Sequence, residues 1–141
     1  MLILDTNVIA AAMTPEKYPI VASWLVTQPT IYTTSVTIME TLNGVYALDK
    51  GKKRAALDVA ANAVFAPLEA AGRVLTFDYA AAFYYATLMM KRPKPTAGEV
   101  LDAQIAAIAL AHDATVATLN VKDFAGKGVK VFDPSTGTHH E

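Results

Sequence analysis

The chain begins with a short run of large apolar side chains that a polar triplet ends. Leu2, Ile3 and Leu4 have no polar residue between them, which is typical of a strand buried on both faces. The triplet at positions 5–7, Asp-Thr-Asn, favours the end of that strand and the cap of a following helix. Ligands of open α/β sheets bind at the carboxyl ends of strands, so Asp5 is the first candidate site residue.

Short strand-like runs and helical spacing alternate along the rest of the chain. Four further strands are predicted near residues 31–33, 73–77, 114–118 and 129–132, with helical patterns between them. This alternation predicts one α/β domain over residues 1–134, with a mostly parallel sheet of about five strands covered by helices on both faces. The polar tail, residues 135–141, is predicted to be disordered.

Composition narrows the class of protein. The 141 residues include no cysteine, which excludes disulfides and thiolate metal sites and fits a cytoplasmic location. No apolar run is long enough to cross a membrane, and the first residues lack the pattern of a signal peptide. The net charge is −1, so any attraction for nucleic acid depends on local clusters. The hydrophobic fraction of 53% suggests that a partner covers part of the surface, and we expect a homodimer.

Three further acids and one amide side chain follow predicted strands, as Asp5 does. Glu40 interrupts a largely apolar helical stretch, where it is either solvated or directed at the first strand. Asp102 lies among apolar neighbours in a predicted helix, and the favourable effect of acids near a helix start explains Glu99 better than Asp102. Asn120 and Asp123 come just after the fourth strand.

Several carboxylates that converge on one crevice repel one another, and burial increases that repulsion. A divalent cation removes the repulsion, and oxygen ligands without cysteine favour Mg²⁺ or Mn²⁺ over zinc. Such ions support phosphodiester hydrolysis. Basic residues that could hold the backbone of an RNA substrate lie in a proline-containing loop and after the fourth strand: Lys91, Arg92, Lys94 and Lys122.

Four stretches together resemble the PIN-domain family, specifically the VapC-like and FitB-like toxins of toxin–antitoxin pairs. They occur in the family's order and cover nearly the whole chain: LDTNVI at residues 4–9, Ser35 with ETLNG at 40–44, DAQIAAIA at 102–109 and ATLNVKDF at 117–124. The resemblance implies a Mg²⁺- or Mn²⁺-dependent endoribonuclease with no small-molecule cofactor. It also implies a dimer that a cognate antitoxin protein holds inactive.

The resemblance also assigns roles to individual residues. The three acids of the family's metal site correspond to Asp5, Glu40 and Asp102. The residues that support the site correspond to Thr6, Asn7 and Thr118. The family's metal site also has a fourth acid. In some relatives it stands at the position of Asn120, whereas others have the Asn-x-x-Asp pattern seen here, in which Asp123 supplies the charge. Many members carry arginine where this chain has Leu119.

Other functional classes fit the sequence less well. A phosphatase of the haloacid dehalogenase type needs a second aspartate two residues after the first, and Asn7 occupies that position. A response-regulator receiver needs an acidic pair at the end of the first strand, which is absent here. The alternative that stays open is a PIN fold that binds a partner without cutting RNA.

Overall fold

The strands form one row in which β1 has a neighbour on each side. The computed structural model describes residues 1–141. The six strands are all short: β1 (Leu2–Leu4), β2 (Thr33–Thr34), β3 (Val74–Leu75), β4 (Thr115–Ala117), β5 (Lys130–Asp133) and β6 (Thr138–His140). The main sheet has the order β1-β4-β5-β6, and β2 pairs with β3 in a second sheet. A bridge between Ile3 and Tyr32 joins the two sheets, and every pairing except β5–β6 is parallel.

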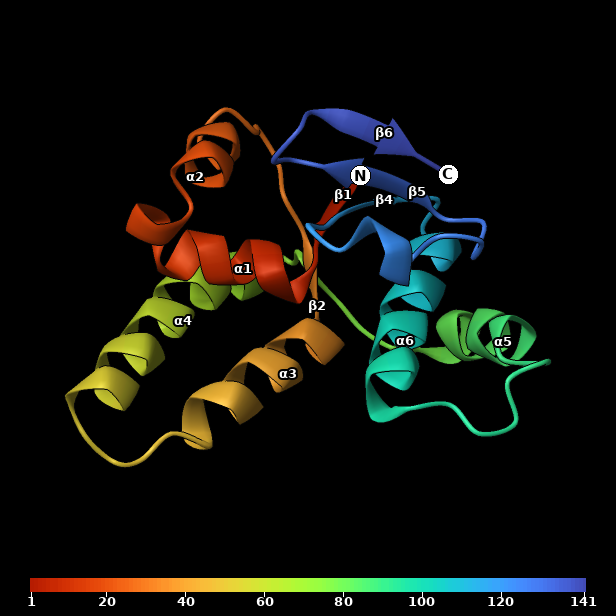
Figure 1. Ribbon diagram of the computed structural model, residues 1–141, viewed down its shortest axis with the longest axis horizontal. Coiled ribbons are helices and arrows are strands. Elements are labelled where there is room, and N and C mark those ends of the chain that lie inside the picture. The colour runs from red at the N-terminus through yellow and green to blue at the C-terminus, as the bar shows by residue number, and fades with distance from the viewer.

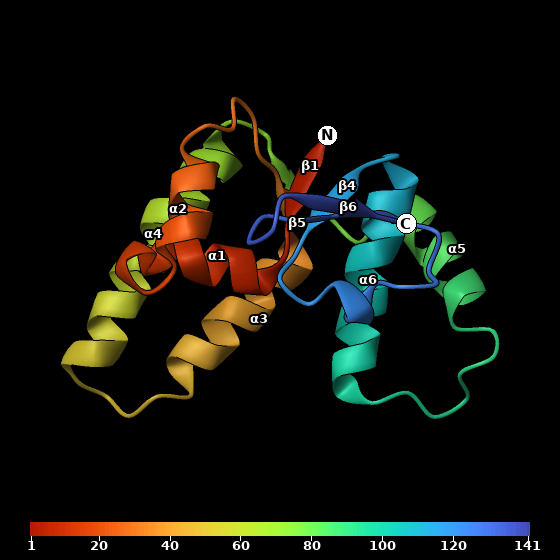
Figure 2. The same ribbon diagram turned by 45° about the horizontal axis from the view of Figure 1, so that its top comes forward.

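Six α-helices and two short 3₁₀ helices connect the strands. They are α1 (Thr6–Met13), η1 (Pro15–Lys17), α2 (Pro19–Leu25), α3 (Ser35–Tyr46), α4 (Lys52–Ala70), α5 (Tyr79–Leu88), α6 (Ala97–Ala111) and η2 (Val121–Asp123). Helices α1, α2 and α4 lie on one side of the strands and α5 and α6 on the other, as Figure 1 and the turned view in Figure 2 both show. The predicted α/β fold with a mostly parallel, doubly covered sheet is therefore confirmed.

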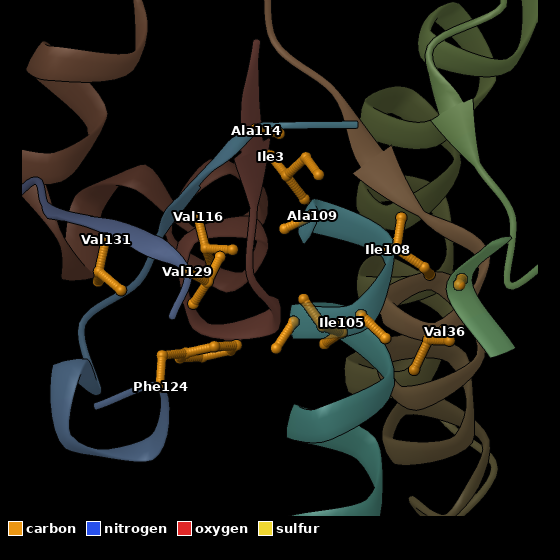
Figure 3. Close-up of a cluster of buried hydrophobic side chains, with 13 residues drawn as sticks. Ile3, Val36, Ile105, Ile108, Ala109, Ala114, Val116, Phe124, Val129 and Val131 are labelled. Atoms are coloured by element: carbon orange, nitrogen blue, oxygen red, sulfur yellow. The ribbon is translucent and has the colours of Figure 1, made fainter. Parts of the chain in front are cut away.

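Alternation along the strands divides the core into two clusters. Ile3, Val116 and Val131 point to the side of α5 and α6, where they pack against Ile105 and Phe124 (Figure 3). The next residues along β1 and β4, at positions 4 and 117, point to the side of α1, α2 and α4. Because both faces are covered, the paired residues of β1 and β4 at positions 3, 4, 116 and 117 are apolar and fully buried.

Local signals explain where the helices that carry site residues begin. Thr34 caps α3 by accepting a hydrogen bond from the Thr37 amide at 3.0 Å. Thr96 and Glu99 form a reciprocal capping box at the start of α6. Glu99 thus has the structural role at the helix start that the sequence suggests for it.

The tail differs from the prediction. Residues 135–141 were predicted to be disordered, but Thr138–His140 forms β6 and pairs antiparallel with β5. A tight turn explains the hairpin, because Asp133 accepts hydrogen bonds from the amide and hydroxyl of Ser135, and Gly137 takes a positive φ of 75°. His139 lies against Phe132 with a ring-centroid separation of 4.8 Å. The predicted sheet of about five strands consequently has four strands in the main sheet and two in the second.

None of the helices combines the length and the apolar character that crossing a membrane requires.

Truncation of Ile105 measures how much the core stabilises the helix that carries Asp102. Its side chain is fully buried, so truncation in Ile105→Ala is expected to lower the free energy of unfolding by about 2–5 kcal/mol in urea titrations. The matched control is Ile20→Ala, whose isoleucine is 67% exposed and whose effect should stay within about 0.5 kcal/mol. Equal effects of the two substitutions would contradict the assignment of this core.

Candidate active site

Asp5 is a buried carboxylate held by fixed donors. It caps α1, and its Oδ1 accepts a hydrogen bond from the Thr6 amide at 2.8 Å. Its Oδ2 accepts a hydrogen bond from the Thr118 hydroxyl, also at 2.8 Å, at the end of β4. Only 5% of Asp5 is exposed. The neighbouring ends of two parallel strands therefore set both the position and the orientation of this carboxylate.

Thr6 and Asn7 connect Asp5 to the elements around it. The Thr6 hydroxyl donates to Glu40 Oε1 at 2.7 Å, which ties α1 to α3. The Asn7 amide group lies 3.5 Å from Asp5 Oδ2, and its Oδ1 accepts a hydrogen bond from the Leu119 amide at 3.0 Å. These residues hold the carboxylates in place, which is the supporting role that the family resemblance implies for Thr6 and Asn7.

One hollow of about 370 Å³ collects the predicted acids. Its lining residues come from the ends of β1 and β4, from helices α1, α3 and α6 and from η2: Asp5, Thr6, Asn7, Ala10, Glu40, Gly98, Asp102, Asn120 and Asp123. Thr118 is fully buried beside it and is bonded to Asp5. The structure thus brings together all four predicted acids and all four predicted supporting residues, although they come from widely separated parts of the sequence.

The acids disturb one another's protonation. Burial is the main cause that raises the pKa of Asp5 from 3.8 to about 6, and the charges of Glu40 and Asp123 raise it further against the hydrogen bonds from Thr118 and Thr6. Burial, followed by the charges of Asp5, Asp123 and Glu40, raises the pKa of Asp102 to about 7. Clustered carboxylates with raised pKa values are typical of functional sites, because side chains that serve only the stability of the fold avoid such repulsion.

The donor set fits a hard divalent cation. All the charged side chains that line the hollow are carboxylates, and the polar ones are a hydroxyl and two amides. No three acidic or histidine side chains stand close enough to coordinate one ion together. Mg²⁺ usually keeps several waters and takes only one or two carboxylates directly, so it does not require three such side chains.

Comparison with known proteins identifies the family. The PIN domain family matches residues 2–128, which include the whole acidic hollow. The chain belongs to the PIN-domain family. Similar proteins include "VapC ribonuclease Y4jK" of Sinorhizobium fredii, which is 35% identical, with 95% of this chain and 97% of the relative covered. "Toxin FitB" of Neisseria gonorrhoeae is also 35% identical, with 95% and 98% covered.

A solved structure shares the whole fold. FitAB bound to an IR36 DNA fragment contains a chain that is 35% identical and superposes with a TM-score of 0.82, covering 100% of both chains. The PIN-domain fold described above therefore extends over the full length of this chain, including the β6 segment beyond the matched residues 2–128.

The predicted basic residues lie outside the acidic hollow of this PIN domain. Lys91, Arg92 and Lys94 stand in the loop between α5 and α6, and Arg92 forms an ion pair with Glu99. Lys122 is exposed on η2. Sequence analysis missed Lys127, the cation whose charge lowers the pKa of Asp102 and whose Nζ donates to the Asp123 carbonyl at 2.5 Å. The only sequence signal for it was its position between two turn glycines four residues after Asp123.

The largest hollow of the molecule has a different character. It measures about 610 Å³ and is lined mostly by aromatic and neutral side chains near the start of β1, including Trp24 and Phe132. The ring centroids of Trp24 and Phe132 are 5.3 Å apart, so Trp24 is a packing residue. No acid lines this hollow, whereas four acids line the smaller one.

The raised pKa values predict how the stability of the metal-free protein depends on pH. The folded state binds more protons than the unfolded state between the ordinary aspartate pKa of 3.8 and about 7, so stability is lost as the pH rises through that window. For Asp5 the loss at neutral pH amounts to about 3 kcal/mol. Thermal melts in EDTA should therefore show a falling Tm between pH 5 and pH 8.

Single charge removals provide the control. Asp102→Asn should flatten this pH dependence, because one of the raised groups no longer titrates. Asp49→Asn, at an exposed position away from the hollow, should leave it unchanged. A Tm that rises with pH in the wild-type protein would contradict the repulsion assigned to the acids.

Proposed function

We propose that this PIN-domain protein is a divalent-metal-dependent endoribonuclease and the toxin of a toxin–antitoxin pair. The observation that carries the proposal is the convergence of four carboxylates from four different elements on one hollow, with the most buried of them fixed by two hydrogen bonds. The similarity to "VapC ribonuclease Y4jK" and to "Toxin FitB", over nearly the whole length of each, supports it.

The cofactor is Mg²⁺ or Mn²⁺. When bound, such an ion lowers the pKa of water and stabilises negative charge on phosphoryl oxygens, which is what phosphodiester hydrolysis requires. Asp5 and Asp102 would hold the ion, and Glu40 and Asp123 would support it through waters. The raised pKa values of Asp5 and Asp102 support this division, because a nearby positive charge favours the ionised form of each of these two carboxylates.

The remaining polar residues orient this set. Thr118 and the Thr6 amide hold the two oxygens of Asp5, while the Thr6 hydroxyl holds Glu40. Asn7 fixes the segment after β4 by accepting from the Leu119 amide. Such partners keep ligand oxygens in one arrangement, so that no reorganisation is needed when the substrate phosphate arrives.

The substrate is RNA whose bases are accessible, in single strands or loops, because a protein cannot read bases inside an A-form helix. The backbone on either side of the cut is held by the basic residues of the loop between α5 and α6 and of η2: Lys91, Arg92, Lys94 and Lys122. A basic rim of this kind is needed because an acidic hollow repels a polyanion.

The partners are a cognate antitoxin protein and a second copy of the chain, and the pair acts in the cytoplasm. The similarity to FitB and to the FitAB structure supports the antitoxin. The exposed apolar side chains of α5 support the homodimer. Tyr79 is 89% exposed and Phe83 is 70% exposed, which is unusual for a surface that only water covers.

Cleavage by purified, antitoxin-free protein is the direct test. We expect cutting of a labelled oligoribonucleotide in Mg²⁺ or Mn²⁺ and none in EDTA, measured on denaturing gels. Asp5→Asn should lower the rate about 100-fold or more, because it removes a charge that the cation needs. Asp49→Asn, which leaves the hollow unchanged, should cut at the wild-type rate.

A folded wild-type protein that binds metal but cuts no RNA offered would contradict the nuclease. That result would favour the alternative, a PIN fold that binds its partner without catalysis. The fourth charge weighs against this alternative, since Asp123 lines the same hollow as the other three acids and its charge raises the pKa of both Asp5 and Asp102.

The fourth position provides a separate test. Because Asp123 contributes negative charge to the hollow and Asn120 does not, Asp123→Asn should lower the cleavage rate more than Asn120→Ala. The double variant Asn120→Asp with Asp123→Asn moves the charge to the other candidate position and should recover part of the loss. A larger defect in Asn120→Ala than in Asp123→Asn would assign the fourth position to Asn120 instead.

A further inference from the structure

Lys127 stands apart from the other cations of the chain because its charge reaches the acidic hollow. Its side chain is half-buried, and its Nζ donates a hydrogen bond to the backbone carbonyl of Asp123. Among the causes that set the pKa of Asp102, Lys127 is the one that lowers it. A positive charge is therefore held at the edge of a cluster of negative ones, where an incoming phosphate must pass.

The turn after η2 explains this position. Gly126 and Gly128 both adopt positive φ angles, 76° and 74°, which glycine tolerates without strain. The chain reverses between them, and the Lys127 amide donates to the carbonyl of Phe124 at 3.4 Å. Phe124 is fully buried in the core, so the turn that carries Lys127 is attached to a rigid part of the fold.

A second hollow adjoins this lysine. It measures about 180 Å³, and its lining residues come from the end of α5, the loop that follows, the first turn of α6 and the turn after η2: Leu88, Met89, Arg92, Glu99 and Lys127. Glu99 and Asp102 are three residues apart and lie on neighbouring turns of the same helix face. The start of α6 thus borders both hollows, with Glu99 lining the second one and Gly98 and Asp102 lining the acidic one.

Two cations face this second hollow. Arg92 is paired with Glu99, but a guanidinium has five N–H donors, and one carboxylate does not use them all. Lys127 has three donors, one of which is directed at the Asp123 carbonyl. The hollow therefore offers free donors from two positive groups within a small space, and this combination suits a phosphate oxygen.

We propose that Lys127 and Arg92 form a subsite for the RNA phosphate that neighbours the phosphate being cut. The subsite rests on the proposed nuclease function and adds a substrate contact to it. With the neighbouring phosphate held in the second hollow at the start of α6, the scissile phosphate lies over the acids of the first hollow. Lys127 accordingly offsets the repulsion between the acids and the RNA backbone.

A purely structural role for Lys127 makes a different prediction. If the lysine only holds the segment that carries Asp123, its loss disturbs the acidic hollow and weakens metal binding. If it binds phosphate, its loss weakens RNA binding and leaves metal binding intact. Measuring both affinities on the same variant therefore separates the two roles.

The test uses Lys127→Met, which keeps the length of the side chain and removes its charge. RNA affinity is measured by fluorescence anisotropy with a short oligoribonucleotide in Ca²⁺, in conditions where a gel shows the RNA intact. We expect binding to weaken about 10-fold or more, and the slope of log affinity against log salt to become shallower by about 0.7. Mn²⁺ affinity should change less than about threefold.

Two variants serve as controls. Lys127→Arg keeps the charge and should retain RNA affinity within about threefold. Lys130→Met removes an exposed lysine of β5 that pairs with Asp113, and it should bind RNA like the wild type. A further oligoribonucleotide carries one neutral methylphosphonate next to the scissile position. The wild-type protein should bind this modified RNA more weakly than unmodified RNA. Lys127→Met should bind the modified and the unmodified RNA equally well.

Two results would overturn the subsite. One is wild-type RNA affinity in Lys127→Met, and the other is a parallel loss of Mn²⁺ and RNA affinity, which would assign the lysine to the loop of Asp123. Failure of the nuclease proposal is recognised separately, as absence of metal-dependent cleavage by the wild type, because the subsite is measured by binding alone.

Discussion

The structure depends on keeping a carboxylate buried at the end of its first strand. Asp5 is almost inaccessible to water, and other acids surround it, so its charged form is stabilised mainly by the Thr6 amide and the Thr118 hydroxyl. The first donor is the backbone amide of the first residue of α1, and the second is the side-chain hydroxyl of the residue just after β4. The pairing of β1 with β4 is therefore required both for the fold and for the position of Asp5 in the site.

Each acid reaches the hollow from an element with its own anchor in the core. The helix of Asp102 is fixed one turn later by Ile105, and the segment of Asp123 is fixed by the fully buried Phe124. Glu40 is tied to α1 through the Thr6 hydroxyl. Since no two of these elements are adjacent in sequence, the arrangement exists only in the completed fold, and rigid packing maintains the repulsion between the acids.

How much the sequence predicts depends on whether the signal is local. The site acids were predictable because strand ends and helix starts are visible in the apolar pattern, and parallel strands end at a common edge. Strand β6 was not, because Thr138–His140 is polar throughout and is ordered by pairing with β5 rather than by a pattern of its own. Lys127 was missed for a related reason, since its importance comes from a fold-dependent approach to Asp123 and Asp102.

The same repulsion links function to stability. A cluster that raises the pKa of Asp5 and Asp102 stores unfavourable electrostatic energy in the metal-free fold, and sequences selected for stability alone would replace one of these acids. A cation that binds only the folded state raises the free energy of unfolding. The increase grows with the logarithm of the ratio of the cation concentration to its Kd. The acids thus make the metal-free fold less stable at neutral pH for the same physical reason that would favour binding of a divalent ion.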